Sequence, residues 1–355
     1  MPSTRAAWRI DRAGSLDRLR LVEETLDPPA PGEARIRVRA IGQNFADALA
    51  CLGLYSATPR GSFVPGLEVA GVVEALGAPV ADRAAGVTVG DRVIALTRFG
   101  GYASALNVDT RYLMPLPAGW SFESGAAFAV QTLTAWYGLV RLGDARRGSV
   151  VLVQSAAGGV GLQALAILAR LGARAVGVVG RESKRDFLVS RALLSRTQVV
   201  VRSPGGSGRA LDAALEACGA RGFDIVFDAV MGDDFRASFA RLAPEGRYVL
   251  YGAADFMPRG RRPGWARLGW QWLRRPRLDP LAMISENRAL LAFNLIWLWD
   301  AIERVPAALA ALAALELAEP WVGARRPFAA APAALAELKA GGTVGKSVLV
   351  VDPTG

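Results

Sequence analysis

The first part of the chain alternates apolar and polar residues over short stretches that glycine and proline interrupt. The segment Arg35-Ile36-Arg37-Val38-Arg39 repeats every second residue, as a strand with one buried face does. This pattern predicts an irregular, mostly antiparallel β domain. Its clearest strands are expected at Ala34–Ala40, Gly71–Leu76, Asp91–Leu96 and Ser104–Asn107.

A different rhythm follows a predicted helix over Glu123–Leu142. Fully apolar runs alternate with helical segments, a pattern typical of a doubly wound parallel sheet. Strands are predicted at Ser149–Gln154, Ala175–Val179, Gln198–Val201, Asp224–Asp228 and Arg247–Tyr251, with a last strand and helix entry over Leu290–Trp299. Helices are predicted at Val160–Leu171, which Gly172 would end, and at Asp186–Leu194 and Arg209–Cys218.

The tail returns to mixed character, with helices predicted at Pro306–Leu317 and Ala331–Ala340 and a closing strand at Ser347–Val351. We therefore expect an α/β protein in which a Rossmann domain interrupts a mainly β domain. The expected boundaries are residues 1–126 for the β domain, 127–300 for the Rossmann domain, and 301–355 for the return to the first domain.

The composition excludes several kinds of catalytic group and metal ligand. The chain has no histidine, which excludes imidazole as a base, proton shuttle or metal ligand, and its two cysteines are too few for a thiolate metal cage. The formal charge of +10 comes almost entirely from arginine, and we attribute most of it to compositional bias. We see no export signal and no apolar run long enough to span a membrane, so we expect a cytoplasmic enzyme.

A loop of small residues lies where an apolar strand meets a helix. Ser155-Ala156-Ala157-Gly158-Gly159-Val160-Gly161 allows a tight turn and a close approach of a pyrophosphate to the helix N-terminus. Ala156 stands where the first glycine of the usual dinucleotide motif would be. The position predicts a dinucleotide site, with contacts from Ala157, Gly158, Gly159, Val160 and Gly161.

The end of the second strand indicates which dinucleotide is bound. An NAD site normally has an acidic residue there, whereas this strand ends at Gly180 and leads to Arg181, Ser183 and Lys184. Two cations and a hydroxyl suit a 2′-phosphate, and Arg202 at the end of the third strand would add another cation. We favour NADPH, although Glu182, if it faced the ribose, would favour NADH.

Several motifs resemble the medium-chain dehydrogenase/reductase superfamily, in particular its zinc-independent quinone oxidoreductase branch. Gly42–Asp47, Gly53-Leu54-Tyr55, Pro65–Val73, Val89–Val93 and Val344-Gly345-Lys346 carry this resemblance. Within that branch, Glu286–Leu295 and the Trp-rich segment before it resemble the synaptic vesicle membrane protein group of the vesicle amine transport type. The resemblance implies a GroES-like fold for the β domain and makes a homodimer the expected assembly.

The same resemblance bears on metal binding. In zinc-dependent members, ligands stand at the positions of Asn44 and Leu67 and near Gln131, and none of these residues is a cysteine or histidine here. Alcohol oxidation through a zinc alkoxide is therefore not expected, and no metal site is predicted.

The resemblance assigns the site's other residues. Tyr55 would approach the nicotinamide and substrate and donate to the acceptor, Asn44 would hold the nicotinamide ribose or the acceptor oxygen, and Thr134 the nicotinamide amide or ribose. Tyr55 packing between the domains, or Asn44 and Asp47 fixing a loop, are the structural alternatives. We also place Gly252, Phe293 and Lys346 with the cofactor-binding residues.

Hydride transfer to a quinone or an enone is the reaction we expect, with an enoyl thioester as the alternative acceptor. A third possibility is a weakly catalytic nucleotide-binding protein that associates with anionic membranes or a partner. The segment from Met257 to Arg277 combines arginines and tryptophans without an acidic residue, which suits an anionic lipid surface or the phosphates of coenzyme A. It also fits a solvated helix covering the substrate site or a dimer edge, and we expect no nucleic-acid binding.

Overall fold

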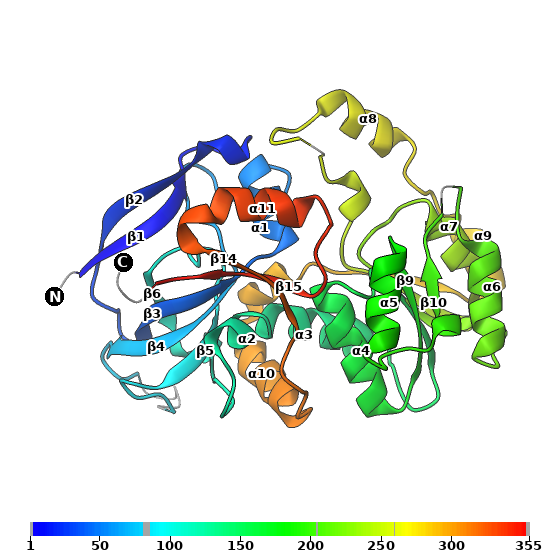
Figure 1. Cartoon of the computed structure of the whole chain (residues 1–355), viewed down its shortest axis with the longest axis horizontal. Helices are drawn as coiled ribbons and strands as arrows, with labels where there is room; N and C mark the ends of the chain where they lie inside the picture. The colour runs from blue at the N-terminus through cyan, green and yellow to red at the C-terminus, as the bar shows by residue number, and fades with distance from the viewer. Residues whose placement is uncertain (1–2, 81–85, 204, 259, 353–355) are drawn as a thin grey trace.

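The computed structural model describes residues 3–80, 86–203, 205–258 and 260–352. An antiparallel ribbon of β1 (Ser3–Ile10) and β2 (Leu19–Leu26) opens the chain. It lies beside the first of two large sheets, and that sheet and the second occupy the left and right halves of the molecule in Figure 1.

The first sheet is mainly antiparallel. Its strand order is β14 (Val322–Pro327), β15 (Lys346–Val350), β3 (Glu33–Gly42), β4 (Glu68–Leu76), β5 (Arg92–Leu96) and β7 (Leu113–Pro115), and β6 (Ala105–Asp109) also pairs with β3. The C-terminal strands β14 and β15 join strands from the first part of the chain, as the predicted return requires. Helices α1 (Phe45–Leu52), α2 (Phe122–Ala126) and α11 (Ala331–Lys339) pack around this sheet, α11 lying over β14 and β15 in Figure 1.

The second sheet is parallel throughout. Its order is β10 (Val199–Val201), β9 (Arg174–Val179), β8 (Val150–Gln154), β11 (Phe223–Asp228), β12 (Leu242–Leu250) and β13 (Ala289–Ala292). The chain starts at the centre with β8, moves outward to β10, and then returns to add β11 to β13 on the other side. This doubly wound order confirms the predicted fold class. Every residue of β8 is buried, because helices cover both faces.

Four helices connect the first five strands of this sheet: α4 (Gly159–Leu171), α5 (Glu182–Ser190), α6 (Gly208–Ala217) and α7 (Asp234–Ala240). Helix α4 ends at Gly172 as expected, with the left-handed backbone (φ +70°) that glycine adopts readily. Helix α5 starts at Glu182 rather than Asp186, because the charged residues of its first turn hide the apolar periodicity. Two of the predicted phosphate-binding residues, Ser183 and Lys184, therefore lie in the first turn of α5, and a third, Arg181, is its N-cap.

The predicted helix over Glu123–Leu142 is three segments rather than one. Helix α2 packs against β3 and β4 of the first sheet, and α3 (Ala129–Trp136) packs against α4 of the second. A π-helical segment, Tyr137–Leu142, follows. The chain bends at Ala127 and Phe128, so that α2 contacts the first sheet and α3 contacts α4 of the second.

The chain between β12 and β13 contains two helices that were not predicted, α8 (Trp265–Leu273) and α9 (Pro280–Glu286). A 3-10 segment (Leu295–Arg304) and α10 (Val305–Ala314) follow β13, and α10 corresponds to the helix predicted at Pro306–Leu317. Short 3-10 turns occur at Leu16–Arg18, Thr110–Tyr112, Arg196–Gln198, Ala254–Phe256 and Phe328–Ala330. Among the described residues, no helix is both long and apolar enough to cross a bilayer.

Candidate active site

The carboxyl edge of the parallel sheet gathers most of the residues predicted to bind a dinucleotide. Because all six strands run the same way, their C-terminal ends lie along one edge. The loop from Ser155 to Gly158 follows β8, the segment from Gly180 to Lys184 follows β9, and Arg202 follows β10. Gly252 and Phe293 follow β12 and β13 on the other side of the switch point between β8 and β11.

The loop after β8 turns sharply into α4. Ser155 adopts a left-handed backbone with φ +55°, and the Gly158 amide donates to the Ser155 carbonyl at 2.8 Å. A Cβ on Gly161 would lie 2.4 Å from the Ser155 oxygen and 2.6 Å from that of Ala156, so only glycine fits. The first turn of α4 presents backbone N–H groups that have no acceptor within the helix, the usual arrangement for binding an anion.

The segment after β9 leaves space beside a group of cations. A Cβ on Gly180 would meet nothing within 4 Å, and Arg181 and Ser183 are exposed. The Lys184 ammonium donates to the Gly341 carbonyl at 3.0 Å, and burial, together with Arg181 and Arg202, lowers its pKa. Glu182, which would have favoured NADH by binding a ribose, forms an ion pair with Arg185.

Arg202 is already bonded on two sides. Its guanidinium donates to Asp234 Oδ2 at 3.2 Å and to Gln154 Oε1 at 3.1 Å. Asp234 is buried and also accepts from the backbone amide of Ser207. Arg202 therefore helps to hold α7 against the sheet, a role that its position after β10 did not reveal.

The C-terminal segment joins the two sheets at the dinucleotide loop. The Gly345 amide donates to the Ala157 carbonyl at 2.8 Å. The next residue, Lys346, is buried, and its ammonium lies 2.8 Å from Asn44 Oδ1 and 2.5 Å from Glu68 Oε1. Lys346 thus reaches from the loop that would hold the cofactor to the residue predicted to hold its ribose.

Asn44 belongs to a fully buried polar network. Its Oδ1 accepts from Gln131 Nε2 at 2.8 Å, and its Nδ2 donates to Glu68 Oε1 at 3.1 Å. The other oxygen of Glu68 accepts from the Val130 amide at 2.8 Å. The Asn44 backbone N–H donates to Asp47 Oδ2 at 2.8 Å, so the alternative in which these two residues fix the start of α1 also holds.

The donor set of this network does not fit zinc. Asn44 and Gln131 are in hydrogen-bond contact, as expected if they occupy ligand positions of zinc-dependent relatives, and both present amide groups. Glu68 is the carboxylate that accepts from the Asn44 side chain, and it is already paired with the Lys346 ammonium. A divalent cation there would have to displace the buried ammonium, and no cluster of three histidine, cysteine or acidic side chains occurs among the described residues.

Three further predicted residues flank the network and the loop. The Thr134 hydroxyl, on α3, donates to the Val130 carbonyl at 2.6 Å, which leaves its oxygen able to accept. Phe293 packs against Tyr137 with ring centroids 5.0 Å apart. A Cβ on Gly252 would lie 2.8 Å from the Ala229 carbonyl oxygen, so glycine there allows the strand ends to pack closely.

Tyr55 bridges the two halves of the molecule. Its hydroxyl donates to Asn294 Oδ1 at 2.8 Å, and Asn294 directly follows Phe293. Burial raises the pKa of Tyr55 to about 12, so the phenol stays protonated at neutral pH. The structure thus gives Tyr55 the interdomain packing role that we considered, with its proton engaged by Asn294.

Glu68, Gln131 and Asn294 contact predicted site residues, but we did not predict them as site residues from the sequence. Glu68 carried a usable signal, because it is a carboxylate directly before the apolar run Val69–Val73, and a buried charge requires a partner. Nothing local distinguished Gln131 or Asn294, because their partners lie 87 and 239 residues away in the sequence.

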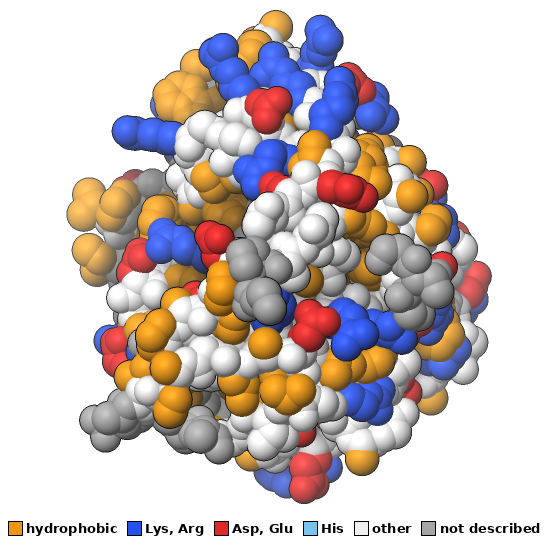
Figure 2. Space-filling view, turned by 90° about the vertical axis from the view of Figure 1, so that its left-hand side faces the viewer, with side chains coloured by type: hydrophobic (Ala, Val, Ile, Leu, Met, Phe, Trp, Pro, Cys, Tyr) orange, Lys and Arg blue, Asp and Glu red, His pale blue; other side chains and the backbone are white. Residues whose placement is uncertain are grey.

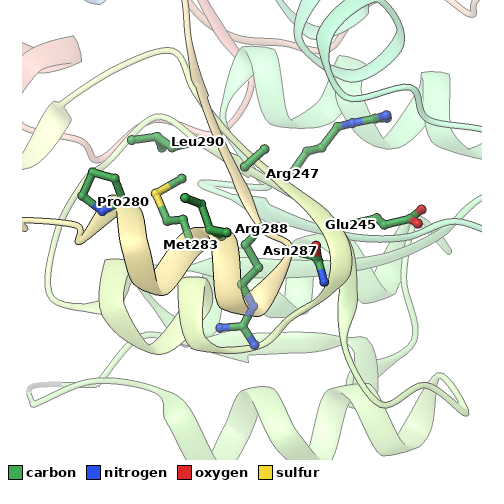
Figure 3. Close-up of a pocket in the computed structure, with 9 residues that line it drawn as sticks. Glu245, Arg247, Pro280, Met283, Asn287, Arg288 and Leu290 are labelled. Carbon is green, nitrogen blue, oxygen red and sulfur yellow. The ribbon is translucent and has the colours of Figure 1, made fainter.

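A surface depression lies away from these residues. An open depression of about 700 Å³ lies between α9 and the first residues of β13. Figure 3 shows Pro280, Met283 and Leu290 on one side of it and Glu245 and Arg247 of β12 on the other. None of the predicted cofactor or catalytic residues lines this depression.

Comparison with known proteins agrees with this arrangement. Residues 30–118 match the alcohol dehydrogenase GroES-like domain, and residues 194–349 match a family described as zinc-binding dehydrogenase. The human synaptic vesicle membrane protein VAT-1 homolog is 32% identical over 349 residues, which cover 96% of this chain and 85% of that protein.

Solved structures of similar proteins include nicotinamide complexes. The mycobacterial protein Rv1454c complexed with NADPH has a TM-score of 0.82 and 29% identity, covering 98% of this chain and 99% of that one. The quinone oxidoreductase from Thermus thermophilus, described with its NADPH complex, has a TM-score of 0.75 and 32% identity, covering 97% and 99%. The chain therefore belongs to the medium-chain dehydrogenase/reductase superfamily, in the family that includes the VAT-1 homologs and the quinone oxidoreductases.

Proposed function

We propose that this chain is a zinc-independent, NADPH-dependent reductase of quinones or enones. The observation that carries the proposal is the continuous path from the dinucleotide loop through Gly345 and Lys346 to Asn44 and Glu68. This path joins a loop suited to a pyrophosphate to a buried polar network. The network has amides and an ammonium at the positions where a metal-dependent relative would hold zinc.

The adenosine end of the coenzyme would lie at the end of β9. The open space at Gly180 accommodates a 2′-phosphate, and Arg181, Ser183 and Lys184 are the groups that would bind it. Burial and neighbouring cations disfavour the charged form of Lys184, so a phosphate dianion at this position would relieve their repulsion. The ion pair between Glu182 and Arg185 removes the carboxylate that would compete for the site.

The nicotinamide end would lie against α3 and the buried network. When bound, the dihydronicotinamide supplies a hydride to the acceptor. The free acceptor capacity of Thr134 suits the N–H of a carboxamide, and the Lys346 ammonium holds Asn44 in a fixed orientation beside it. Hydrogen-bond donors held in this way would stabilise the negative charge that develops on the oxygen of the acceptor.

Tyr55 is the group we propose to donate to that oxygen. Its raised pKa keeps the hydroxyl protonated, and the hydrogen bond to Asn294 gives the ring a fixed direction. Donation to a substrate requires the hydroxyl to rotate from Asn294 to the acceptor. Tyr55→Phe is expected to lower kcat about tenfold or more with little change in the KM for NADPH. Unchanged turnover would remove Tyr55 from the reaction.

The choice of acceptor is tested by initial rates of NADPH oxidation. We expect turnover with a simple quinone and with an α,β-unsaturated ketone to exceed turnover with a short enoyl-CoA. If enoyl-CoA gives the highest kcat/KM, the chain is an enoyl thioester reductase. Tight NADPH binding with no turnover on any of the three would instead indicate a non-catalytic nucleotide-binding protein.

We also propose a homodimer formed through β13. This strand is the last of the parallel sheet, and Leu290 is exposed on it beside the apolar residues Pro280, Met283 and Ile284. A second copy adding its own β13 would cover this edge and the depression. Sedimentation should show a dimer that Leu290→Arg dissociates, and a monomer at all accessible concentrations would contradict the proposal.

A further inference from the structure

Tyr55 and Asn294 come from different halves of the molecule. Tyr55 follows α1 beside the first sheet, and Asn294 follows β13 at the edge of the second. Figure 2 views the first half from the side turned away from the second, and basic, acidic and apolar side chains are interspersed on that face. The pair instead lies where the two halves meet, so it forms only when they are in this relative position.

Tyr55 has a fixed ring and a hydroxyl that can turn. The ring packs against the core of the first sheet and against an apolar cluster that joins β5 to the segment Leu295–Arg304. The Tyr55 carbonyl accepts from the Thr58 backbone N–H at 2.9 Å and from the Thr58 hydroxyl at 2.6 Å, which holds the backbone in a turn. Rotation about the phenol C–O bond therefore moves the hydrogen and leaves the oxygen in place.

The Asn294 side chain contacts three groups. Its Oδ1 accepts from the Tyr55 hydroxyl at 2.8 Å and from the Ile296 backbone N–H at 3.3 Å. Its Nδ2 donates to Ser56 Oγ at 3.3 Å. The amide thus presents its oxygen to the phenol and its nitrogen to a serine hydroxyl, while it caps the segment Leu295–Arg304.

Donation by Tyr55 to a substrate conflicts with this orientation of the amide. Once the phenol hydrogen turns to the substrate, the phenol oxygen and Asn294 Oδ1 face each other at 2.8 Å with no hydrogen between them. Two acceptors at that distance repel, and the repulsion grows as the phenol oxygen becomes negative. Turning the amide over exchanges Oδ1 and Nδ2 and places an N–H donor against the phenol oxygen.

Ser56 suits both orientations of the amide. Its hydroxyl can accept from Nδ2 or donate to Oδ1, and Ser56 is exposed, so the hydroxyl can rotate. The bond that the turn removes is the long one to Ile296. After the turn, donors and acceptors alternate from Ser56 through Asn294 and Tyr55 to the substrate, and bonds in such a chain strengthen one another.

We propose that Asn294 is a positioning residue whose amide turns over when substrate binds and then donates to the phenol oxygen of Tyr55. The proposal rests on the proposed function, in which Tyr55 donates to the acceptor. In that reaction the acceptor gains a hydride from the dihydronicotinamide, which is oxidised, and a proton from Tyr55. Water then returns a proton to the phenolate, which the Asn294 N–H stabilises in the meantime.

Asn294→Asp tests the donor role. The change keeps the shape, the acceptor oxygen and the N-cap but removes the N–H group. With a quinone and NADPH at neutral pH, we expect kcat to fall roughly tenfold and the KM for NADPH to change little. Lowering the pH from about 8 to about 5 protonates part of the carboxyl and restores a donor, so kcat relative to the parent should rise about twofold or more.

A purely structural role predicts a different result. An ionised carboxylate caps a helix as well as asparagine does, so a cap alone gives the parent kcat at the higher pH. Unchanged kcat in Asn294→Asp, or a loss that does not recover as the pH falls, overturns the proposal. Asn107→Asp is the matched control, since it adds a carboxylate beside Arg35 outside the site, and it should keep the parent kcat and pH profile.

A double variant shows whether Asn294 acts through Tyr55. Tyr55→Phe has no phenol oxygen, so adding Asn294→Asp should lower kcat no further, and losses that multiply overturn the proposal. Parent turnover and a slow Tyr55→Phe variant, together with a failed Asn294 result, remove only this inference. A parent without turnover, or a fully active Tyr55→Phe variant, removes the proposed donor and this inference with it. NADPH affinity measured on each variant establishes that the protein is folded.

Discussion

Lys346 and Glu68 are both buried, and each is the main counter-charge of the other. Asn44 and Gln131 complete the network through amide groups, so that all the charges in it are paired. Such a network fixes side-chain positions closely because every alternative leaves a charge without a partner. The need to pair each buried charge determines how a substitution in this network should change stability.

Removing the Lys346 ammonium tests directly whether the buried Glu68 needs a counter-charge. Lys346→Met leaves Glu68 buried without a cation, which is expected to cost about 3 to 5 kcal/mol of unfolding free energy. Chemical denaturation measures this loss. Adding Glu68→Gln should restore part of it, because the second change removes the unpaired charge. A single variant as stable as the parent would contradict the buried pairing.

Asp47 should make stability depend on pH. Burial raises the pKa of Asp47 to about 7, because it outweighs the hydrogen bond from the Asn44 backbone N–H and the charge of Lys346, both of which lower it. Among the described residues, Asp47 Oδ1 has no hydrogen-bond partner. The unfolded chain releases this proton near pH 4, where a carboxyl ordinarily titrates. The folded protein therefore holds the proton more tightly, and its contribution is full below pH 4 and is lost as pH rises towards 7.

Asp47→Asn should remove this dependence. Free energies of unfolding measured from pH 4 to 8 should fall less steeply with pH in the variant than in the parent. Glu303→Gln, a change at an exposed carboxylate outside the network, serves as the control and should retain the parent slope. Identical slopes in parent and Asp47→Asn would show that Asp47 is ionised in the folded protein over the whole range.

Coenzyme choice should depend on Lys184. Lys184→Ala is expected to raise the KM for NADPH about tenfold or more and to leave that for NADH nearly unchanged, because only NADPH carries the 2′-phosphate. Glu182→Gln is the matched control, since Glu182 is paired with Arg185, and it should change neither value. Equal effects of Lys184→Ala on both coenzymes would contradict the assignment.

At the scale of elements, the loop between β8 and α4 is defined by close backbone contacts. Gly161→Ala would force a Cβ against two backbone oxygens, which cannot move independently of the strand. We expect NADPH binding at least about tenfold weaker and a loss of roughly 2 kcal/mol in stability. Gly269→Ala in α8, where a Cβ meets nothing within 4 Å, is the control and should be neutral or slightly stabilising.

The elements that the sequence predicted well are those whose environment is uniform along their length. Strand β8 is buried on both faces and reads as an unbroken apolar run, and α4 has a clear glycine stop. Helix α5 was placed four residues too late because its first turn carries charges that face solvent or a ligand. Helix α8 has no buried residue, so the spacing of its apolar residues does not correspond to a side packed against the core.

At the scale of the molecule, distant segments form the site. The bond from Gly345 to Ala157, the contact of Lys346 with Asn44, and that of Tyr55 with Asn294 all cross between the two sheets. Motifs indicated which segments carry the chemistry, and the parallel sheet brought the cofactor residues to one edge. The side-chain partners could not be predicted, because they depend on how the two sheets meet.

The central claim is that metal-free protein binds NADPH and uses it for reduction. The most direct measurement combines NADPH titration with quinone-dependent oxidation, before and after treatment with a strong chelator and with metal content determined. We predict tighter binding of NADPH than of NADH and unchanged turnover in chelated protein. Failure to bind either coenzyme, or turnover lost to the chelator and restored by zinc, would contradict the account.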